Sequence, residues 1–344
     1  MAFLKVLICG SGCAGPALAF WLARAGHRVV IIERFPALRA SGAQIDLRAQ
    51  GIEVVKRMGL LDTIRGKLVD EEGVSFVDTR GNVLGTVMAN KSGKGGQSLT
   101  SEYEIMRGDL VRILYEATMN NVKYIFDKTV ERFEQDENQV VAYFSDDSSD
   151  TFDLLVGADG QGSHDSRDLS SIPRAPVEQQ KEFWAQRFLG AGWETDRFLE
   201  GLKTTGNFYC QEIVQVLIDK WYKGRVVLLG DAAYCPSPFS GMGTTGSFVG
   251  AYVLAAEINR NPENLAQAFA NYEKTLRPFV NEIQKVNTSF LRFTMPDTKW
   301  GIAILHFITR LVCFLRIPEI IAKLSKEEKG GWKLPDYPEL KLGS

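Results

Sequence analysis

Apolar and polar positions over the first 33 residues follow the order strand, glycine turn, helix, strand. Residues 6–8 form a short apolar run of the kind that a parallel sheet buries on both faces. A helical pattern begins at Pro16 and ends at Gly26, and a second apolar strand over residues 29–32 ends at Glu33. This order predicts a βαβ unit at the start of an α/β fold.

Further along the chain, the pattern predicts more helices and strands. Residues 74–87 read as a β-hairpin, because two strand-like runs flank a turn that contains glycine and asparagine. Other extended segments are expected over residues 122–127, 140–144, 152–160, 207–218 and 225–233. Helices are expected around residues 52–58, from 105 to 117, over 178–202 and up to about 258, and residues 161–177 read as a loop.

The C-terminal part reads as helical, and residues 301–315 are strongly apolar. This run carries His306 and Arg310 and is shorter than the ~20 residues that a transmembrane helix needs. We therefore expect no integral membrane span and a helix that is buried by packing. Peripheral contact with a membrane is the alternative.

Composition narrows the class of protein. A chain of 344 residues is long enough for two domains. Its net charge of −2, without a basic stripe, argues against a nucleic-acid partner. The five cysteines are scattered and form no CxxC pair, and the three histidines lack ligand spacing. We expect free thiols, a cytoplasmic location, no metal and a monomeric protein.

The glycine turn itself carries candidate chemistry, because residues 10–15 spell GxGxxG. Gly10 would make the turn, Gly12 would let the backbone approach a pyrophosphate, and Gly15 would let the helix pack against the sheet. The helix N-terminus offers N–H groups and positive charge to phosphates. Glu33, eighteen residues after Gly15, can accept adenosine ribose hydroxyls. The pattern alone does not distinguish NAD from FAD.

Two later segments also end at an acid. Residues 157–160 read Gly-Ala-Asp-Gly, and residues 230–233 read Gly-Asp-Ala-Ala, with Pro238, Gly241 and Gly243 downstream. In this order, the three motifs resemble the single-component FAD-dependent monooxygenases of the para-hydroxybenzoate hydroxylase type. The tetracycline-inactivating branch looks closest, and the resemblance covers residues 1 to about 165 and 180 to about 290.

The resemblance implies a Rossmann-like FAD-binding domain of the glutathione-reductase type, with a reduced β-sheet substrate domain and C-terminal helices. It assigns residues 1–73, 104–165 and 219–290 to the FAD-binding domain. Residues 74–103 and 166–218 would form the truncated substrate domain, and residues 291–344 the C-terminal helical segment.

The resemblance also implies roles for individual residues. Glu33 would bind the adenosine ribose, Asp159 the pyrophosphate and Asp231 the ribityl chain, while Arg107 would reach the flavin side of the cofactor. The cofactor-binding set is Gly10, Gly12, Cys13, Ala14, Gly15, Glu33, Arg34, Arg39, Arg107, Asp159, Asp231, Pro238, Gly241, Gly243 and Thr244. The substrate-binding set is Gln44, Asp46, Tyr209 and Phe239.

Plainer interpretations of these residues stay open. The acids can simply cap turns at strand ends, and Gln44 and Asp46 can be ordinary loop residues. Arg107 can be a surface arginine near a helix start, and aromatic residues such as Tyr209 and Phe239 are more often core than pocket.

The implied reaction is an oxygenation in secondary metabolism. NADPH would reduce the flavin, O2 would add as a C4a-hydroperoxide, and one oxygen atom would pass to a small organic substrate, which we expect to be bulky and apolar or polycyclic. No catalytic side chain of the protein is required, which agrees with the absence of a Ser-His-Asp or Cys-His pattern.

One departure from the family pattern divides the hypotheses. Asp231 follows Asp159 by only 72 positions, an interval in which the family places most of its substrate sheet, and Ser166 stands where the family has an arginine. A compact monooxygenase is the first hypothesis. The alternative is an FAD-binding protein that has lost oxygenation and acts as a non-redox cyclase, isomerase or scaffold. An NAD-dependent dehydrogenase is disfavoured by the motif at Asp231.

Overall fold

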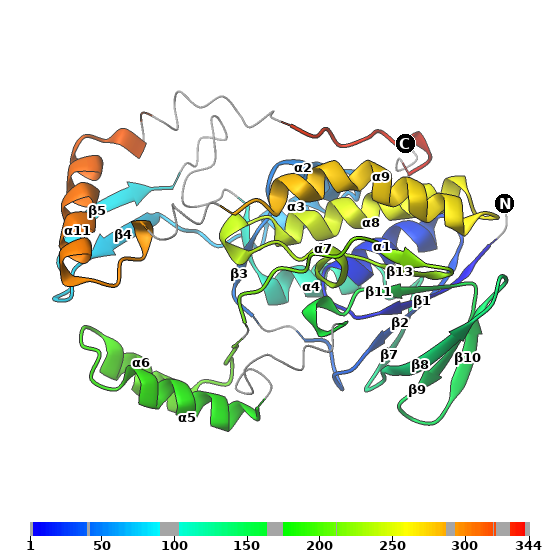
Figure 1. The fold of residues 1–344 in the computed structure, drawn as a ribbon, viewed down its shortest axis with the longest axis horizontal. Helices are drawn as coiled ribbons and strands as arrows, with labels where there is room; N and C mark the ends of the chain where they lie inside the picture. The colour runs from blue at the N-terminus through cyan, green and yellow to red at the C-terminus, as the bar shows by residue number, and fades with distance from the viewer. Residues whose placement is uncertain are drawn as a thin grey trace.

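The computed structural model describes residues 3–39, 42–89, 103–163, 175–210, 212–286, 293–318, 320 and 331–340. At its centre is a six-stranded sheet in the order β12–β13–β11–β1–β2–β7 (Figure 1). Its strands run parallel except for β12, which pairs antiparallel with β13. The strands are β1 (Lys5–Cys9), β2 (Arg28–Glu33), β7 (Lys123–Phe126), β11 (Leu154–Gly157), β12 (Tyr222–Lys223) and β13 (Val226–Leu228).

Both faces of this sheet are buried, because successive residues of a strand point to opposite faces. Val6 and Ile8 pack in the core with the helices α1 (Ala14–Arg24), α8 (Gly243–Arg260) and α9 (Leu265–Ile283). Leu7 packs on the other face against the antiparallel sheet of β8 (Val130–Gln135), β9 (Val140–Phe144) and β10 (Ser149–Phe152). Figure 1 shows the resulting order of layers: helices, parallel sheet and antiparallel sheet.

Smaller elements lie beside this core and shape its open edge. Strands β3 (Gln44–Asp46) and β6 (Glu104–Met106) pair antiparallel, with Asp46 opposite Glu104. The remaining short elements near the core are α2 (Ala49–Arg57), α3 (Leu61–Arg65), α4 (Arg107–Glu116), α7 (Asp231–Tyr234), η1 (Gly160–Ser163), η3 (Pro238–Ser240) and η4 (Pro338–Leu340). Because β6 leads directly into α4, the pairing fixes the position of the first residue of α4, Arg107.

Several predicted elements need correction. The helix expected from residue 105 begins at Arg107, after strand β6, and strands β8 and β10 were not predicted. The helix expected over 178–202 is two helices, α5 (Val177–Phe188) and α6 (Thr195–Thr204), because Gly190 and Gly192 take positive φ values of 74° and 84° between them. Part of the predicted loop over 161–177, including Ser166, lies outside the described residues.

The extended segment expected over residues 207–218 forms no strand in its described part, residues 207–210 and 212–218. Among the described residues it has no strand partner, so it adds nothing to the hairpin of β4 (Gly73–Val77) and β5 (Val83–Met88). The predicted hairpin itself is confirmed as a two-stranded sheet.

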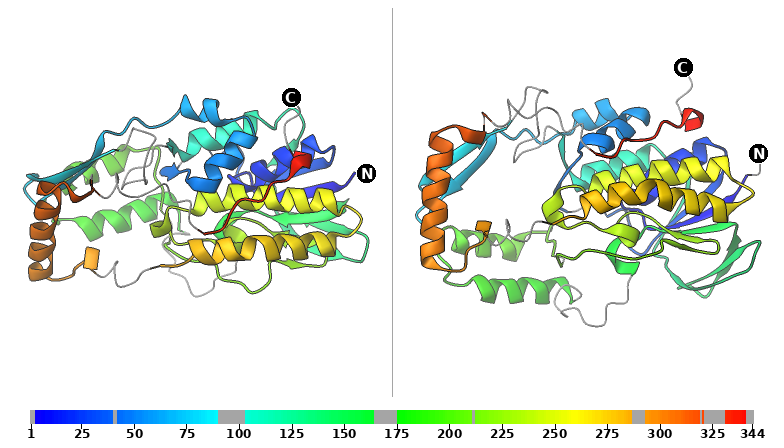
Figure 2. Two further views of the ribbon diagram at one scale, coloured as in Figure 1. Left: turned by 90° about the horizontal axis from the view of Figure 1, so that it is seen from above. Right: turned by 45° about the horizontal axis from the view of Figure 1, so that its top comes forward.

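Helix α11 (Lys299–Phe314) packs on β5 at the end of the molecule away from the termini (Figures 1 and 2). The expectation that this helix is buried is wrong: none of its residues is buried, and Trp300 and Phe314 are 83% and 82% exposed. Apolar composition alone could not show that the second face of α11 lacks a partner among the described residues. In the described part of the chain, no helix has both the length and the apolar character to cross a membrane.

Candidate functional site

A cavity of about 1070 Å³ opens where the parallel strands end. Cys9, Glu33 and Gly157, the last residues of β1, β2 and β11, all line it. Ligands of open α/β sheets bind outside the carboxyl ends of the strands, so the position of the cavity follows from the topology of the sheet.

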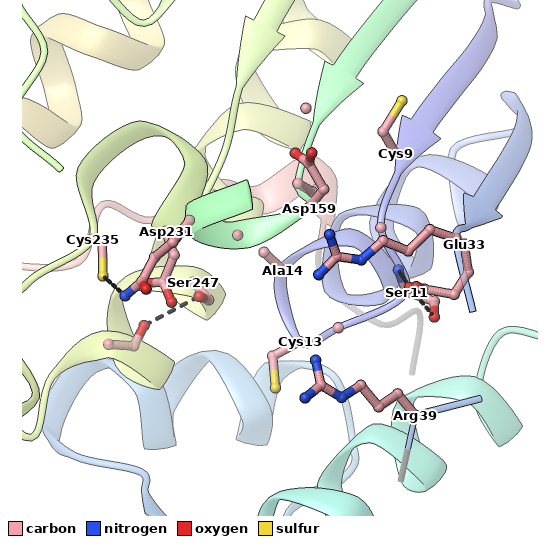
Figure 3. Close-up of a pocket in the computed structure, with 18 of the residues that line it drawn as sticks. Cys9, Ser11, Cys13, Ala14, Glu33, Arg39, Asp159, Asp231, Cys235 and Ser247 are labelled. Atoms are coloured by element: carbon pink, nitrogen blue, oxygen red, sulfur yellow. Dashed lines mark hydrogen bonds between the residues drawn. The ribbon is translucent and has the colours of Figure 1, made fainter. Parts of the chain in front are cut away.

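Most of the predicted site residues line this cavity. They come from the glycine turn, β2, the β3–β6 pair, α4 and the segments after β11 and β13. The lining includes Gly10, Gly12, Cys13, Ala14, Glu33, Arg34, Arg39, Gln44, Asp46, Arg107, Asp159, Tyr209, Asp231, Pro238, Gly241, Gly243 and Thr244. Glu33, Asp159 and Asp231, far apart in sequence, therefore meet at one site (Figure 3).

Two predicted residues do not line the cavity. Gly15 lies within α1, where a Cβ atom would sit 2.1 Å from the carbonyl oxygen of Gly10, so its part is close packing. Phe239 is a residue of η3 with 49% of its surface exposed, and it is absent from the cavity wall. The substrate-binding role of Phe239 stays a prediction.

Glu33 is held at the end of β2 by the glycine turn. Its Oε2 accepts hydrogen bonds from the backbone N–H and the Oγ of Ser11, both at 2.9 Å, and its Oε1 accepts one from the N–H of Phe35 at 3.2 Å. A carboxylate offers about four acceptor sites, so these bonds leave one on Oε1 for a ligand hydroxyl. Figure 3 shows the carboxylate beside Ser11.

The start of α1 is built to receive an anion. Gly10 takes φ = +111°, and a Cβ atom there would lie 2.6 Å from the carbonyl oxygen of Ala158. At Gly12 a Cβ would meet only Arg107 Nη2, at 3.6 Å, so the backbone at Gly12 stays open to the cavity. Helix α1 has no side-chain cap in the described structure and no acid in its first turn, which leaves its N–H groups for phosphate oxygens.

Gly230 brings Asp231 to the same place. It has φ = +65°, and a Cβ atom there would lie 2.9 Å from the Cβ of Ala14 and 3.1 Å from Oγ of Ser247. The turn before α7 therefore packs against the starts of both α1 and α8. As a result, the N-terminus of α8, with Gly243 and Thr244, faces the same cavity as that of α1.

The groups around Asp231 have opposing effects on the pKa of its carboxyl group. Burial raises the pKa of its carboxyl group, while a hydrogen bond with Cys235 and the charge of Arg107 work in the opposite direction. Burial and the charge of Asp231 raise the pKa of Cys235 to about 12, and burial also raises the pKa of Cys13. Both cysteines therefore stay protonated at neutral pH and are poor nucleophiles.

Strands β3 and β6 contribute two carboxylates to the cavity wall, Asp46 and Glu104. Oδ2 of Asp46 bonds the guanidinium of Arg48 at 2.6 Å, while its buried Oδ1 finds no partner in the described part of the chain. Glu104, opposite Asp46, was missed from sequence. Burial, Asp46 and Glu71 raise the pKa of Glu104 to about 7. The available signal was its position three residues before Arg107, at the end of a short strand.

These features fit an FAD molecule. The volume of about 1070 Å³ lies just above the ~300–1,000 Å³ range of small-molecule sites, so it suits a large ligand. The free acceptor site of Glu33 suits a ribose, and the uncapped start of α1 suits a pyrophosphate.

Comparisons with known proteins agree with this geometry. The FAD binding domain family matches residues 4–208. An FAD-dependent monooxygenase of Sarocladium schorii, asL4, is 36% identical over 431 aligned positions that cover 99% of each chain, and a flavin-dependent monooxygenase of a Phoma species, eupH, is 35% identical over 90% of this chain and 91% of its own.

The first alignment has at least 87 positions without a counterpart in the 344 residues here. Among solved structures, the tetracycline destructase Tet(51) superposes with a TM-score of 0.76 at 27% identity, over 98% of this chain and 100% of its own. The chain thus belongs to the family of FAD-dependent monooxygenases.

Proposed function

We propose that this protein uses NADPH and O2 to insert one oxygen atom into a bulky apolar or polycyclic organic substrate, with FAD held in the cavity. The observation that supports this best is the meeting of Glu33, Asp159 and Asp231 in one cavity, with Arg107 beside them. The similarity to Tet(51), a tetracycline destructase, supports a polycyclic substrate.

In this proposal one part of the cavity binds FAD and the β3–β6 end binds the substrate. Glu33 binds the adenosine ribose, the start of α1 binds the pyrophosphate, and Asp231 binds the ribityl chain. The N-terminus of α8 faces the flavin ring and favours negative charge there. FAD, when bound, supplies the redox and oxygen-activating chemistry.

The substrate lies at the β3–β6 end, beside Gln44, Asp46 and Glu104. The pKa of Glu104 is about 7, raised by burial, by Asp46 and by a hydrogen bond with Glu71, so in its protonated form Glu104 is a hydrogen-bond donor at the substrate end, where Asp46 is an acceptor. Tyr209 is 37% exposed and closes part of the cavity wall.

A second function is favoured because, among the described residues, no sheet covers the β3–β6 end of the cavity. Among the described residues, the hairpin β4–β5 contacts α11 rather than the cavity, and residues 207–210 and 212–218 form no sheet. Oxygen transfer needs an active site from which water is excluded. A protein that binds FAD but acts as a non-redox cyclase, isomerase or scaffold is the alternative.

One experiment separates the two functions. The FAD-loaded protein is reduced with NADPH under anaerobic conditions, mixed with O2 in a stopped-flow instrument, and assayed with ¹⁸O2 against a panel of polycyclic phenols. Incorporation of label into product, in proportion to NADPH consumed, supports the monooxygenase. Consumption of NADPH that yields only hydrogen peroxide with every substrate supports the alternative. A protein that does not retain FAD would contradict both.

A further inference from the structure

Helix α11 presents a continuous apolar stripe to solvent. Its members recur at intervals of four and three residues and therefore share one face of the helix. This α11 stripe consists of Trp300 (83% exposed), Ile304 (55%), Phe307 (67%), Leu311 (46%) and Phe314 (82%). Soluble proteins rarely leave such contiguous apolar surface uncovered, so the stripe marks an interaction site.

The opposite side of α11 is occupied by β5. A Cβ atom on Gly85 would lie 2.5 Å from Sγ of Cys313, so the helix and the hairpin are in tight contact there. At 100° per residue, Cys313 lies on the side of the helix away from the stripe. A hollow of about 660 Å³ runs between the stripe and β5, with Phe307, Phe314 and Leu84 in its wall. Leu311 and Arg310 also line this hollow, yet Phe307, Leu311 and Phe314 remain 67%, 46% and 82% exposed, so the stripe is open to solvent on its outer side.

The two charged side chains within α11, Lys299 and Arg310, are both cationic. Lys299 and Arg310 both lie about 90° from its centre, on the same edge. Arg316 follows the helix, and the nearest acids in sequence, Asp297 and Glu319, lie outside the helix itself. The face is thus apolar in the middle and positive at its edge, which is the character of a helix that lies in the interface of an anionic membrane.

A second copy of the chain fits this face less well, because an antiparallel two-fold contact between two α11 stripes would place the edge with Arg310 and Lys299 beside the same cationic edge of the other copy. A nucleic acid would match the charge but not the apolar centre. We propose that the α11 stripe docks on anionic phospholipid, with the aromatic side chains at the boundary between headgroups and acyl chains. This proposal is independent of the reaction that the cavity performs.

The test is co-sedimentation of the full-length, FAD-loaded protein with vesicles of phosphatidylcholine alone or with about 30% phosphatidylserine. We expect binding to the anionic vesicles, weakened roughly tenfold on neutral vesicles and reduced by high salt. Emission of Trp300 should shift to shorter wavelength on binding, and Trp300→Phe should abolish that shift.

A matched pair of double variants tests the location. Phe307→Ser with Phe314→Ser removes two aromatic residues of the stripe, whereas Phe183→Ser with Phe198→Ser removes two exposed aromatic residues from α5 and α6. The first should lose at least tenfold in vesicle affinity and the second should bind as the parent does, with unchanged FAD absorption in both. Equal loss in the two, no binding by the parent, or a dimer that only the first variant breaks would each overturn the proposal.

Discussion

At the scale of single residues, Glu33 does two things with one carboxylate. Its three hydrogen bonds hold the glycine turn and the start of the next loop, and the residue also lines the cavity, with one acceptor site left for a ligand. Substitution of Glu33 should therefore affect both the stability of the glycine turn and the affinity for the cofactor. A conservative substitution, which keeps the size of the side chain, tests the effect on cofactor affinity.

Glu33→Gln should weaken FAD binding by roughly tenfold, because an amide is neutral and replaces one charged acceptor with a donor. Fluorescence titration of the apoprotein with FAD measures this. Glu116→Gln, an exposed residue at the end of α4, is the control and should bind FAD as the parent does. Equal affinity in Glu33→Gln and the parent would remove Glu33 from the cofactor site.

Glu104 gives a prediction for pH. Its pKa is raised from 4.5 to about 7, first by burial and then by Asp46 and Glu71. The folded state therefore holds this proton to higher pH than the unfolded state does, and stability falls as pH rises from about 4.5 to about 7 and then levels off. Because the group is partly exposed, we expect about 1 kcal/mol from it.

Glu104→Gln should remove that part of the pH dependence, since glutamine does not titrate. Urea unfolding at a series of pH values between 4.5 and 8 measures it in the variant and in the parent. An identical slope in both proteins would show that other groups cause the change.

The candidate site was predictable where its chemistry is local in sequence. The glycine turn, Glu33 and the acids at 159 and 231 each follow a short apolar strand, and parallel strands bring such ends to one edge. Glu104 was not predictable in this way, because its neighbours Asp46 and Glu71 reach it through the pairing of β3 with β6 and through the loop after α3.

At the scale of elements, the packing of the turn at Gly230 against α1 and α8 decides whether the cavity forms. Gly230→Ala should destabilise the fold by about 3 kcal/mol, because the new Cβ would combine left-handed strain with a 2.9 Å contact to Ala14. Gly190→Ala is the control: its φ is +74°, with nothing within 4 Å, so only about 1 kcal/mol of strain is expected.

Thermal and urea unfolding of both variants measure this difference, and FAD titration shows whether affinity falls with it. Similar losses in the two variants would mean that backbone strain alone accounts for the effect, and that the contact between the turn and α1 is dispensable.

Strand β8 and helix α11 were predicted wrongly because the sequence pattern of a segment does not show which other element will cover it. Strand β8 is largely exposed and charged, so it lacks the apolar pattern that reveals a buried strand. Helix α11 has the composition of a core helix, yet its second face meets no described element. Sequence patterns report what a segment could bury, whereas the partner that would bury it is set by the rest of the chain.

At the scale of the whole molecule, burial is uneven. Fourteen consecutive residues of α8, Thr245–Ile258, are buried, whereas α6 and α11 bury none of theirs. The described contacts of α5 and α6 are mainly with each other, and those of α11 are with β5. The cavity belongs to the well-packed part, since its wall contains no residue of α5, α6 or α11.

This division predicts the order of local opening. Amide hydrogens of α6 and α11 should exchange with deuterium orders of magnitude faster than those of α1 and α8, because few buried contacts oppose their opening. Hydrogen-exchange mass spectrometry of the FAD-loaded protein measures this peptide by peptide. Bound FAD should slow exchange at the starts of α1 and α8 but leave α6 and α11 unchanged. Protection of α11 equal to that of α8 would instead show that its exposed stripe is covered in solution, even without lipid, and that the molecule opens as one unit.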